Sequence, residues 1–347
     1  MLRRARKLSR CGPTGRAATL GVLLALGASG LPGSPASASQ PDIYYIWRDG
    51  VRLADGVNPY AYDRATSPEE RSTKHPSYLP LFYLAVAGVY KLGVREYATW
   101  LALWRAVRIA AHVAIAIVLY LAGRRAGRPL LGLFGAVFWS LNRWTLYTVR
   151  SGGLDPLALL FLLLSLECFG RRRRLAYLLL GTSLAVKHVA LLVAPLYLVW
   201  TWQDPDMLCR RERWTRTARA SLWIAVIPLA VSLPFLWWDP GAFVRSILSS
   251  VTRPDRGYGH VSAVGSLLGL RGGVARIPLV LVASLILLVA ACRQVIGHYT
   301  TLLLMFTVFT DFNTVLFPQY FVWAIPFIVL AAMERAAARP REIAGAT

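Results

Sequence analysis

The sequence predicts an all-α polytopic membrane protein, and its composition is the first reason. Of the 347 residues, 56% are apolar and only 16% are charged, proportions typical of membrane proteins rather than soluble ones. About ten apolar segments follow one another along the chain, and a spanning helix needs about twenty apolar residues, or fewer inside a bundle. Short arginine clusters lie between these segments, which is the pattern expected of cytosolic loops.

The strongly basic charge does not point to a nucleic-acid partner. The net charge is +22, which makes such a partner worth considering. The basic residues, however, gather in short clusters between apolar runs, as topology signals do, and do not define one binding face. These clusters lie at 3–7, 124–125, 171–174 and 210–211.

The apolar segments divide the chain into four regions. Residues 1–38 form a cytosolic basic start with the first membrane segment, 39–98 an extracytoplasmic loop with juxtamembrane helices, 99–335 a transmembrane bundle and 336–347 a cytosolic tail. The expected spanning helices are 17–36, 99–121, 129–149, 154–170, 175–187, 188–202, 220–237, 276–293, 298–316 and 319–334.

Two stretches allow a second interpretation. Residues 1–38 also resemble a cleavable signal sequence, with a basic start, a short apolar core and Ala36-Ser37-Ala38. The segment 78–93 fits either a full span or a short juxtamembrane or re-entrant helix. We favour the short helix, because a full span would place the arginine clusters at 124–125 and 171–174 outside, against the charge rule.

The stretch 175–202 is long for one helix and carries Lys187 and His188 in its middle. A charge near the middle of the bilayer costs several kcal/mol unless it faces protein or water. Two short helices that meet near the outer surface at Lys187 avoid this cost. The same path brings the polar loops around 152–156, 238–262 and 317–319 to the outer face.

Another polar stretch lies just after the first apolar segment. Residues 41–50 (PDIYYIWRDG) and 56–60 (GVNPY) bring together carboxylates, guanidiniums and aromatic rings. A membrane protein with such a loop beside its first membrane segment is expected to work at the bilayer surface, on a lipid-linked substrate. A carboxylate suits acid–base work there, because partial burial beside aromatic rings raises its pKa.

Four motifs, found in the same order and spacing, resemble those of the GT-C superfamily of membrane glycosyltransferases. They are the first loop, with Asp42, 56–60 and 78–82 (YLPLF); the stretch 142–156; the stretch 181–195 (GTSLAVKHVALLVAP); and Phe312-Asn313 with 319–323 (QYFVW). Over residues 40–335 the chain is similar to the polyprenol-phosphate-mannose-dependent enzymes of glycosyltransferase family 87 and to the first mannosyltransferase of GPI-anchor synthesis. Where the GPI enzymes have Asp-x-Asp, this chain has Asp42 and Asp49, seven positions apart.

The resemblance implies a GT-C-type helix bundle and a glycosyltransferase. Such an enzyme transfers a sugar, with mannose as the first candidate, from a polyprenyl-phosphate donor to a lipid or glycan acceptor on the outer face. We expect a multi-pass protein of a bacterial plasma membrane, with its N-terminus in the cytosol, its active site outside and membrane lipids around it. No cofactor is expected, since the lipid-linked sugar is the donor substrate.

Asp42 is the candidate base that takes the proton of the acceptor hydroxyl. Asp49 follows two helical turns later and is expected on the same helix face, as a second catalytic candidate. Each residue also has a simpler interpretation. Asp42 fits a helix cap, and Asp49 fits a solvated surface residue, a sugar ligand or a partner of Arg48 or Arg52.

Cations are needed to hold the departing phosphate. Lys187 is the first candidate, because it is the costliest residue to place in a membrane; the others are His188, Arg150, Lys74 and His75. The alternatives are that Lys187 extends its charge to the interface, that His188 only packs, and that the Lys74-His75 pair marks the membrane boundary.

The candidates for acceptor or sugar binding are Asp155, Tyr44, Gln319, Tyr320 and His260. Asp155 fits a helix N-cap before Pro156 almost equally well. His260 belongs to an outer loop that could cover the site. Trp323 is expected in the bundle core or in an interfacial aromatic belt.

No metal motif is present, because the sequence has no HExxH, no cysteine pair and no tight carboxylate cluster. A divalent ion held by Asp42, Asp49 or Asp155 stays open but is not expected. Two other functions also fit. A flippase or transporter for a lipid-linked sugar would explain Lys187, although no internal repeat is visible. A non-catalytic subunit of a membrane glycosyltransferase complex would explain the short chain.

Overall fold

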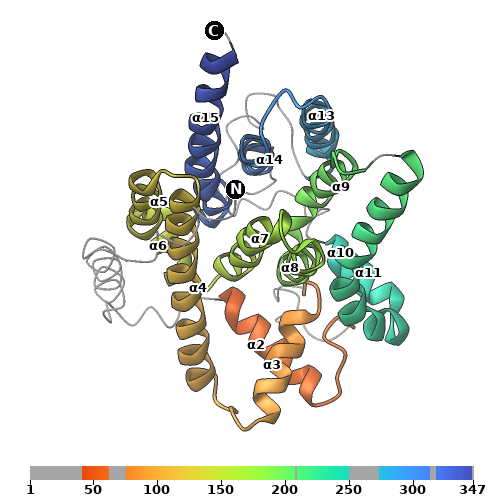
Figure 1. The fold of residues 1–347 in the computed structure, drawn as a ribbon. Coiled ribbons are helices and arrows are strands. Elements are labelled where there is room, and N and C mark those ends of the chain that lie inside the picture. Colours follow the sequence, from red (N-terminus) through yellow and green to blue (C-terminus); the bar gives the residue numbers. More distant parts are fainter. Residues whose placement is uncertain (1–40, 62–75, 208, 250–272, 313–317, 346–347) are drawn as a thin grey trace.

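The computed structural model describes residues 41–61, 76–207, 209–249, 273–312 and 318–345 (Figure 1). These residues form helices and no strand. The helices are α2 (Pro41–Ala54), α3 (Leu81–Lys91), α4 (Tyr97–Arg125), α5 (Pro129–Leu141), α6 (Arg143–Arg150), α7 (Asp155–Phe169), α8 (Arg173–Val186), η3 (His188–Val193), α9 (Ala194–Trp202), α10 (Arg210–Trp238), α11 (Pro240–Leu248), α13 (Gly273–Cys292), α14 (His298–Phe312), η4 (Pro318–Trp323) and α15 (Ile325–Gly345).

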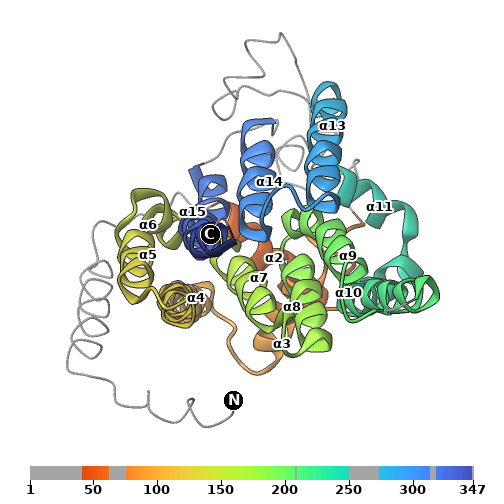
Figure 2. The ribbon, with the colours of Figure 1, turned by 45° about the horizontal axis from the view of Figure 1, so that its top comes forward.

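The longer helices pack in two rows. Figure 2 shows α5, α4, α7, α8 and α10 in one row, with α15, α14 and α13 in a second row against it. The short helices α2 and α3 lie beside the beginning of α4, in the lower part of Figure 1. The structure is therefore a helical bundle with an additional helical layer at one of its ends.

Two of the described helices, α4 and α10, are long and apolar enough to cross a membrane, with 29 residues each. The helices α6 and α7 pass the same test together and are bent by 120° at their junction, so that the described chain has up to three such spans. Shorter apolar helical segments, of 10–17 residues, are Leu81–Lys91, Pro129–Leu141, His188–Trp202 and the part Ile277–Cys292 of α13. These helices suggest a membrane protein, whereas the expected number of about ten spans is not confirmed.

One reason for the short helices is that two expected spans are broken. The segment 129–149 was expected as one helix, and this is wrong: α5 ends at Leu141 and Asn142 is extended, with φ −67° and ψ 133°. The side-chain oxygen of Asn142 accepts a hydrogen bond from the N–H of Trp144 (2.9 Å) and so begins α6. The expected helix 319–334 is likewise divided, into η4 and α15.

Two other expectations are confirmed. The segment 78–93 contains one short helix, the 11-residue α3. The stretch 175–202 breaks at Lys187, whose backbone is extended (φ −151°, ψ 120°) between α8 and η3. On α8, a Cβ at Gly181 would overlap the carbonyl oxygen of Ile224, so that glycine lets α8 approach α10 closely.

Aromatic side chains attach α2 and α3 to the bundle. The ring of Trp47 on α2 lies 5.2 Å from that of Trp100 on α4, and the ring of Phe82 on α3 lies 4.7 Å from that of Trp104. Such ring pairs add to the gain from burying apolar area. A Cβ at Gly50 would overlap the side chain of Val86, so the glycine is what lets α2 and α3 touch.

The motif 56–60 anchors the loop after α2. The side-chain oxygen of Asn58 accepts from the N–H of Tyr60 (3.0 Å), and the Tyr60 hydroxyl donates to the carbonyl of Tyr78 (2.8 Å). The buried Tyr60 ring packs against Phe235 of α10 and Phe243 of α11. The residues Asn58 and Tyr60 of this motif therefore have a structural role, in a turn and in packing against α10 and α11.

The arginine clusters come together at one end of the bundle, which we call the basic end. Arg125 of α4 pairs with Glu167 of α7. Asp204, just after α9, pairs with Arg173 of α8 and, at 3.6 Å, with Arg216 of α10. The first contact joins the last turns of α4 and α7 to each other, and the contacts of Asp204 join the end of α9 to the beginnings of α8 and α10. The helices α4 and α7 therefore both end at the basic end, whereas α8 and α10 both begin there.

Replacing the Asp204 side chain should destabilise the protein in a pH-dependent way. Burial alone would raise the pKa of Asp204, but the hydrogen bonds from Arg173 and the backbone of Asp206, with the charges of Arg173 and Arg216, hold it below its ordinary value. This stability is present above the unfolded pKa of about 3.9 and is lost as the pH falls through the folded pKa. Asp204→Asn should cost about 1.5–3 kcal/mol at pH 7.

Thermal unfolding of the purified protein in detergent, followed from pH 7 to pH 3, measures this effect. The difference between wild type and Asp204→Asn should begin to shrink below about pH 4, where the carboxylate of the unfolded chain takes up a proton before that of the folded protein does. The matched control is Asp206→Asn, two residues away and exposed. A difference that stays constant over the whole pH range would contradict the prediction.

Candidate functional site

A buried ion pair lies at the break between α8 and η3. The Nζ atom of Lys187 is 2.5 Å from Oδ1 of Asp155, the first residue of α7. Only 7% of the Lys187 side chain and 1% of the Asp155 side chain are exposed. The structure thus brings together two residues for which the sequence predicted separate roles.

Two aromatic residues complete this group. The indole N–H of Trp323 donates to the same Oδ1 of Asp155 (2.7 Å), and the ring centroid of Tyr320 lies 5.3 Å from the Lys187 Nζ. Both belong to η4, so the late motif 319–323 reaches the centre of the group. We call Lys187, Asp155, Tyr320 and Trp323 the Lys187 cluster.

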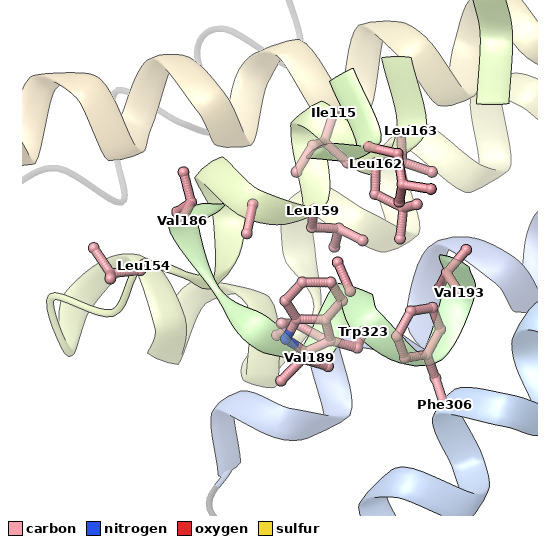
Figure 3. Close-up of a cluster of buried hydrophobic side chains, with 14 of the residues drawn as sticks. Ile115, Leu154, Leu159, Leu162, Leu163, Val186, Val189, Val193, Phe306 and Trp323 are labelled. Atoms are coloured by element: carbon pink, nitrogen blue, oxygen red, sulfur yellow. The ribbon is translucent and has the colours of Figure 1, made fainter. Parts of the chain in front are cut away.

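The core of the bundle holds Trp323 in place. Its side chain is fully buried, and Figure 3 shows it among apolar residues of other helices. These neighbours include Leu159 of α7, Val189 of η3 and Phe306 of α14, whose ring centroid is 5.4 Å from that of Trp323. A side chain packed on all sides keeps one rotamer, so the direction of its N–H is set by the core.

The loop before α7 determines where Asp155 points. Gly152 adopts a positive φ of 83°, and its carbonyl accepts from the indole of Trp104 on α4 (3.0 Å). A Cβ at Gly153 would lie 3.0 Å from Oδ2 of Asp155, too close without a shift. Leu154, and not Asp155, occupies the N-cap position of α7. The alternative of Asp155 as the N-cap is therefore wrong, and its carboxylate serves the Lys187 cluster.

The Lys187 cluster lies far from the basic end. Asp155 begins α7, whereas Glu167, which pairs with Arg125, lies near its last turn. The loop before Asp155 is attached through Trp104 to the first third of α4, close to the aromatic contacts of α2 and α3. Since α4 has 29 residues and is about 43 Å long, the polar site and the arginine clusters lie at opposite ends.

Other predicted phosphate and acceptor residues lie around the cluster. His188 follows Lys187 and is half-buried, with its ring 6.5 Å from that of Tyr78. Arg150 is the exposed last residue of α6, and Gln319 is half-buried in η4 next to Tyr320. The structure therefore keeps these three near the same helix junctions, and their roles stay predictions.

Asp49 is held inside the protein. Its Oδ1 accepts from Nε (3.1 Å) and NH2 (2.8 Å) of Arg48, and only 2% of its side chain is exposed. Burial raises the pKa of Asp49 above its ordinary value, while Arg48 and Arg52 act in the opposite direction. The alternative of a solvated surface residue is wrong. The alternative in which Asp49 orients Arg48 agrees with the geometry.

Asp42 is the second residue of α2, seven positions before Asp49. Two turns of helix, or about 10 Å along the axis, separate the two positions. Tyr44, a predicted sugar ligand, is 47% exposed, and its ring packs on Tyr97 of α4 (5.3 Å). Lys74, His75 and His260 lie outside the described residues. Within the described ranges, no group of three His, Cys, Asp or Glu residues could hold a metal ion.

Two residues of α4 near the site were not singled out from the sequence. Arg108 is buried and donates to the carbonyl of Val149 at the end of α6, and its Nε has no hydrogen-bond partner. His112, one turn further on, is also buried and packs against Trp139 (5.1 Å). Charged and polar residues inside an apolar segment are a known sign of function, and this signal was present in 99–121.

No protein-family model matches the chain. No curated protein matches it either. What the site can do is therefore inferred from its own residues.

Removing one member of the buried ion pair should cost more than removing both charges. Lys187→Met leaves the Asp155 carboxylate buried without its cation, which typically costs about 3–5 kcal/mol. Adding Asp155→Asn removes that charge, keeps an acceptor for Trp323 and should recover part of the loss. Thermal unfolding in detergent of both single variants and the double variant measures this coupling.

The matched control is Lys91→Met, at the exposed end of α3. It should change the unfolding temperature little, because surface substitutions have small effects. If the losses of the two single variants simply add in the double variant, the two charges are not coupled, and the prediction fails.

Proposed function

We propose that the protein transfers a sugar, with mannose as the first candidate, from a polyprenyl-phosphate donor to a lipid or glycan acceptor at the outer face of the membrane. One observation carries the proposal: the side chain of Lys187 is buried inside the bundle, at the break between α8 and η3. A buried cation is expensive and is kept where an anion must be bound. A lipid phosphate is an anion that arrives from within the bilayer.

The chemistry needs a base and a cation at one place. As the acceptor oxygen attacks the anomeric carbon, its proton passes to a carboxylate, and the bond between that carbon and the phosphate oxygen breaks. The phosphate leaves with the electron pair and is stabilised by positive charge. In the proposal Asp42 is the base and Lys187 binds the phosphate. Asp49 orients Arg48, with which it shares two hydrogen bonds.

The position of the site supports the outer face. The arginine clusters gather at the basic end, and the positive-inside rule assigns such clusters to the cytosol. The Lys187 cluster lies at the other end of α7 and thus towards the outside. The proposal includes a GT-C-type bundle in a bacterial plasma membrane, in which the bent pair α6–α7 and the broken pair α8–α9 serve as membrane segments.

A flippase for the same lipid-linked sugar is the second candidate. The buried pair of Lys187 and Asp155 favours it, because carriers also keep paired charges inside the membrane. A flippase moves the lipid without forming a glycosidic bond. Measuring the product, and not only the binding of the lipid, therefore separates the two functions.

The proposed base predicts a large loss of transfer in Asp42→Asn. Membranes that contain the protein are incubated with radiolabelled polyprenyl-phosphate-mannose, and the label in lipid or glycan products is counted. Asp42→Asn should lower the rate about 100-fold or more, because general bases contribute 10²–10⁴-fold. Asp55→Asn, in the exposed turn that ends α2, is the matched control and should keep the wild-type rate.

A second pair of variants tests the cation. Lys187→Ala should lower transfer strongly, whereas Lys91→Ala at the exposed end of α3 should not. Full transfer by Asp42→Asn would refute its role as the base. A wild-type protein that is folded and inserted but transfers nothing would exclude this donor, and lipid flipping by that protein would favour the second candidate.

A further inference from the structure

In the structure, the cation proposed for phosphate binding already has a counter-ion. Lys187 Nζ lies 2.5 Å from the Asp155 carboxylate, and both side chains are almost fully buried. A phosphate that binds Lys187 must therefore compete with Asp155 or displace it. The sequence alone did not reveal this competition, because it placed Asp155 with the acceptor.

We infer that Asp155 is the resting counter-ion of Lys187, and that the phosphate monoester of a lipid takes its place on binding. The inference rests on the proposed function, because it explains how the donor phosphate reaches its cation. Lys187 then exchanges one anion for another inside a single buried site. The bundle never has to bury the ammonium group without a negative charge beside it.

The surroundings of Lys187 suit such an exchange. The residue lies in an extended break between α8 and η3, and its four-carbon stem carries three rotatable N–H donors. Asp155 occupies one direction, and the face of the Tyr320 ring, at 5.3 Å, covers another. A small rotation of the stem can present the ammonium to a phosphate while it stays near the ring.

Two interactions stabilise the Asp155 carboxylate when Lys187 turns away from it. Its Oδ1 keeps the hydrogen bond from Trp323 (2.7 Å), which does not depend on Lys187. Its place in the first turn of α7 gives the carboxylate a favourable interaction with the helix dipole. Trp323 is therefore a positioning residue: it acts on the phosphate through Asp155.

The exchange predicts opposite effects for two conservative substitutions. Asp155→Asn keeps the shape and an acceptor for Trp323 but removes the competing charge, so phosphate should bind more tightly. Trp323→Phe keeps the ring contact with Phe306 but removes the N–H, so releasing Lys187 from Asp155 costs more and phosphate should bind more weakly. A purely structural role for either residue would weaken binding in both variants or change it in neither.

The test uses the full-length protein in lipid nanodiscs and radiolabelled undecaprenyl phosphate. We expect the dissociation constant to fall about tenfold in Asp155→Asn, which corresponds to about 1.4 kcal/mol, and to rise several-fold in Trp323→Phe. The matched control is Asp204→Asn, which removes another buried carboxylate with cationic partners, but at the basic end. That control should lose stability and keep the wild-type affinity.

Two further probes identify the anion. Undecaprenol lacks the phosphate, so its dissociation constant should be the same in wild type and in Asp155→Asn. If inorganic phosphate binds and responds to Asp155→Asn as the lipid does, the site takes a free phosphate and the lipid assignment is overturned. If only the phosphorylated lipid responds, the headgroup is the ligand.

Unchanged or weaker binding in a folded Asp155→Asn protein would overturn the exchange. Should that variant fail to fold, Trp323→Phe decides alone, and wild-type affinity there overturns the inference. Because this measurement involves no sugar transfer, its result is separate from that of the proposed function. A protein that exchanges its counter-ion but forms no glycosidic bond would refute only the transferase.

Discussion

The cost of burying the ammonium group of Lys187 is the constraint on which the site depends. A lone charge in such surroundings costs several kcal/mol, so the protein must supply a partner for it. Asp155 provides the charge, Tyr320 a ring face, and Trp323 the hydrogen bond that orients the carboxylate. The helix break at Lys187, the turn before α7 and the helix η4 all serve this one arrangement.

A second constraint separates the two ends of the bundle. Acidic residues near the ends of α7 and α9 pair with the arginines of one end, whereas aromatic rings attach α2 and α3 at the other. Many exposed apolar side chains lie on the helices between these ends, as do Leu222 and Leu233 of α10. This distribution is what a bundle within a lipid bilayer requires, because lipid can satisfy apolar surface but not charge.

Several local features could be read from the sequence with a physical reason. The lysine and histidine in the middle of 175–202 predicted a break, and the break is at Lys187. The arginine clusters required the segment 78–93 to be short, and α3 has 11 residues. The interruption at Asn142 was missed, because the apolar run that begins at Pro129 was extended to residue 149 across this capping residue. Arg108 and His112 were passed over inside an equally apolar run, although their polarity was visible.

The sequence by itself predicted the membrane character that the apolar helices suggest, and it identified the residues too costly to leave without a partner. These follow from composition and from the price of a charge in hydrocarbon, which act locally along the chain. Only the tertiary structure decided which residues meet. Asp155 and Trp323 are 168 positions apart in the chain and share one hydrogen bond. The pairing of Asp49 with the adjacent Arg48 was among the sequence alternatives, but the burial of Asp49 was not. A contact such as that between Asp155 and Trp323 depends on the packing of whole helices, and no local pattern encodes it.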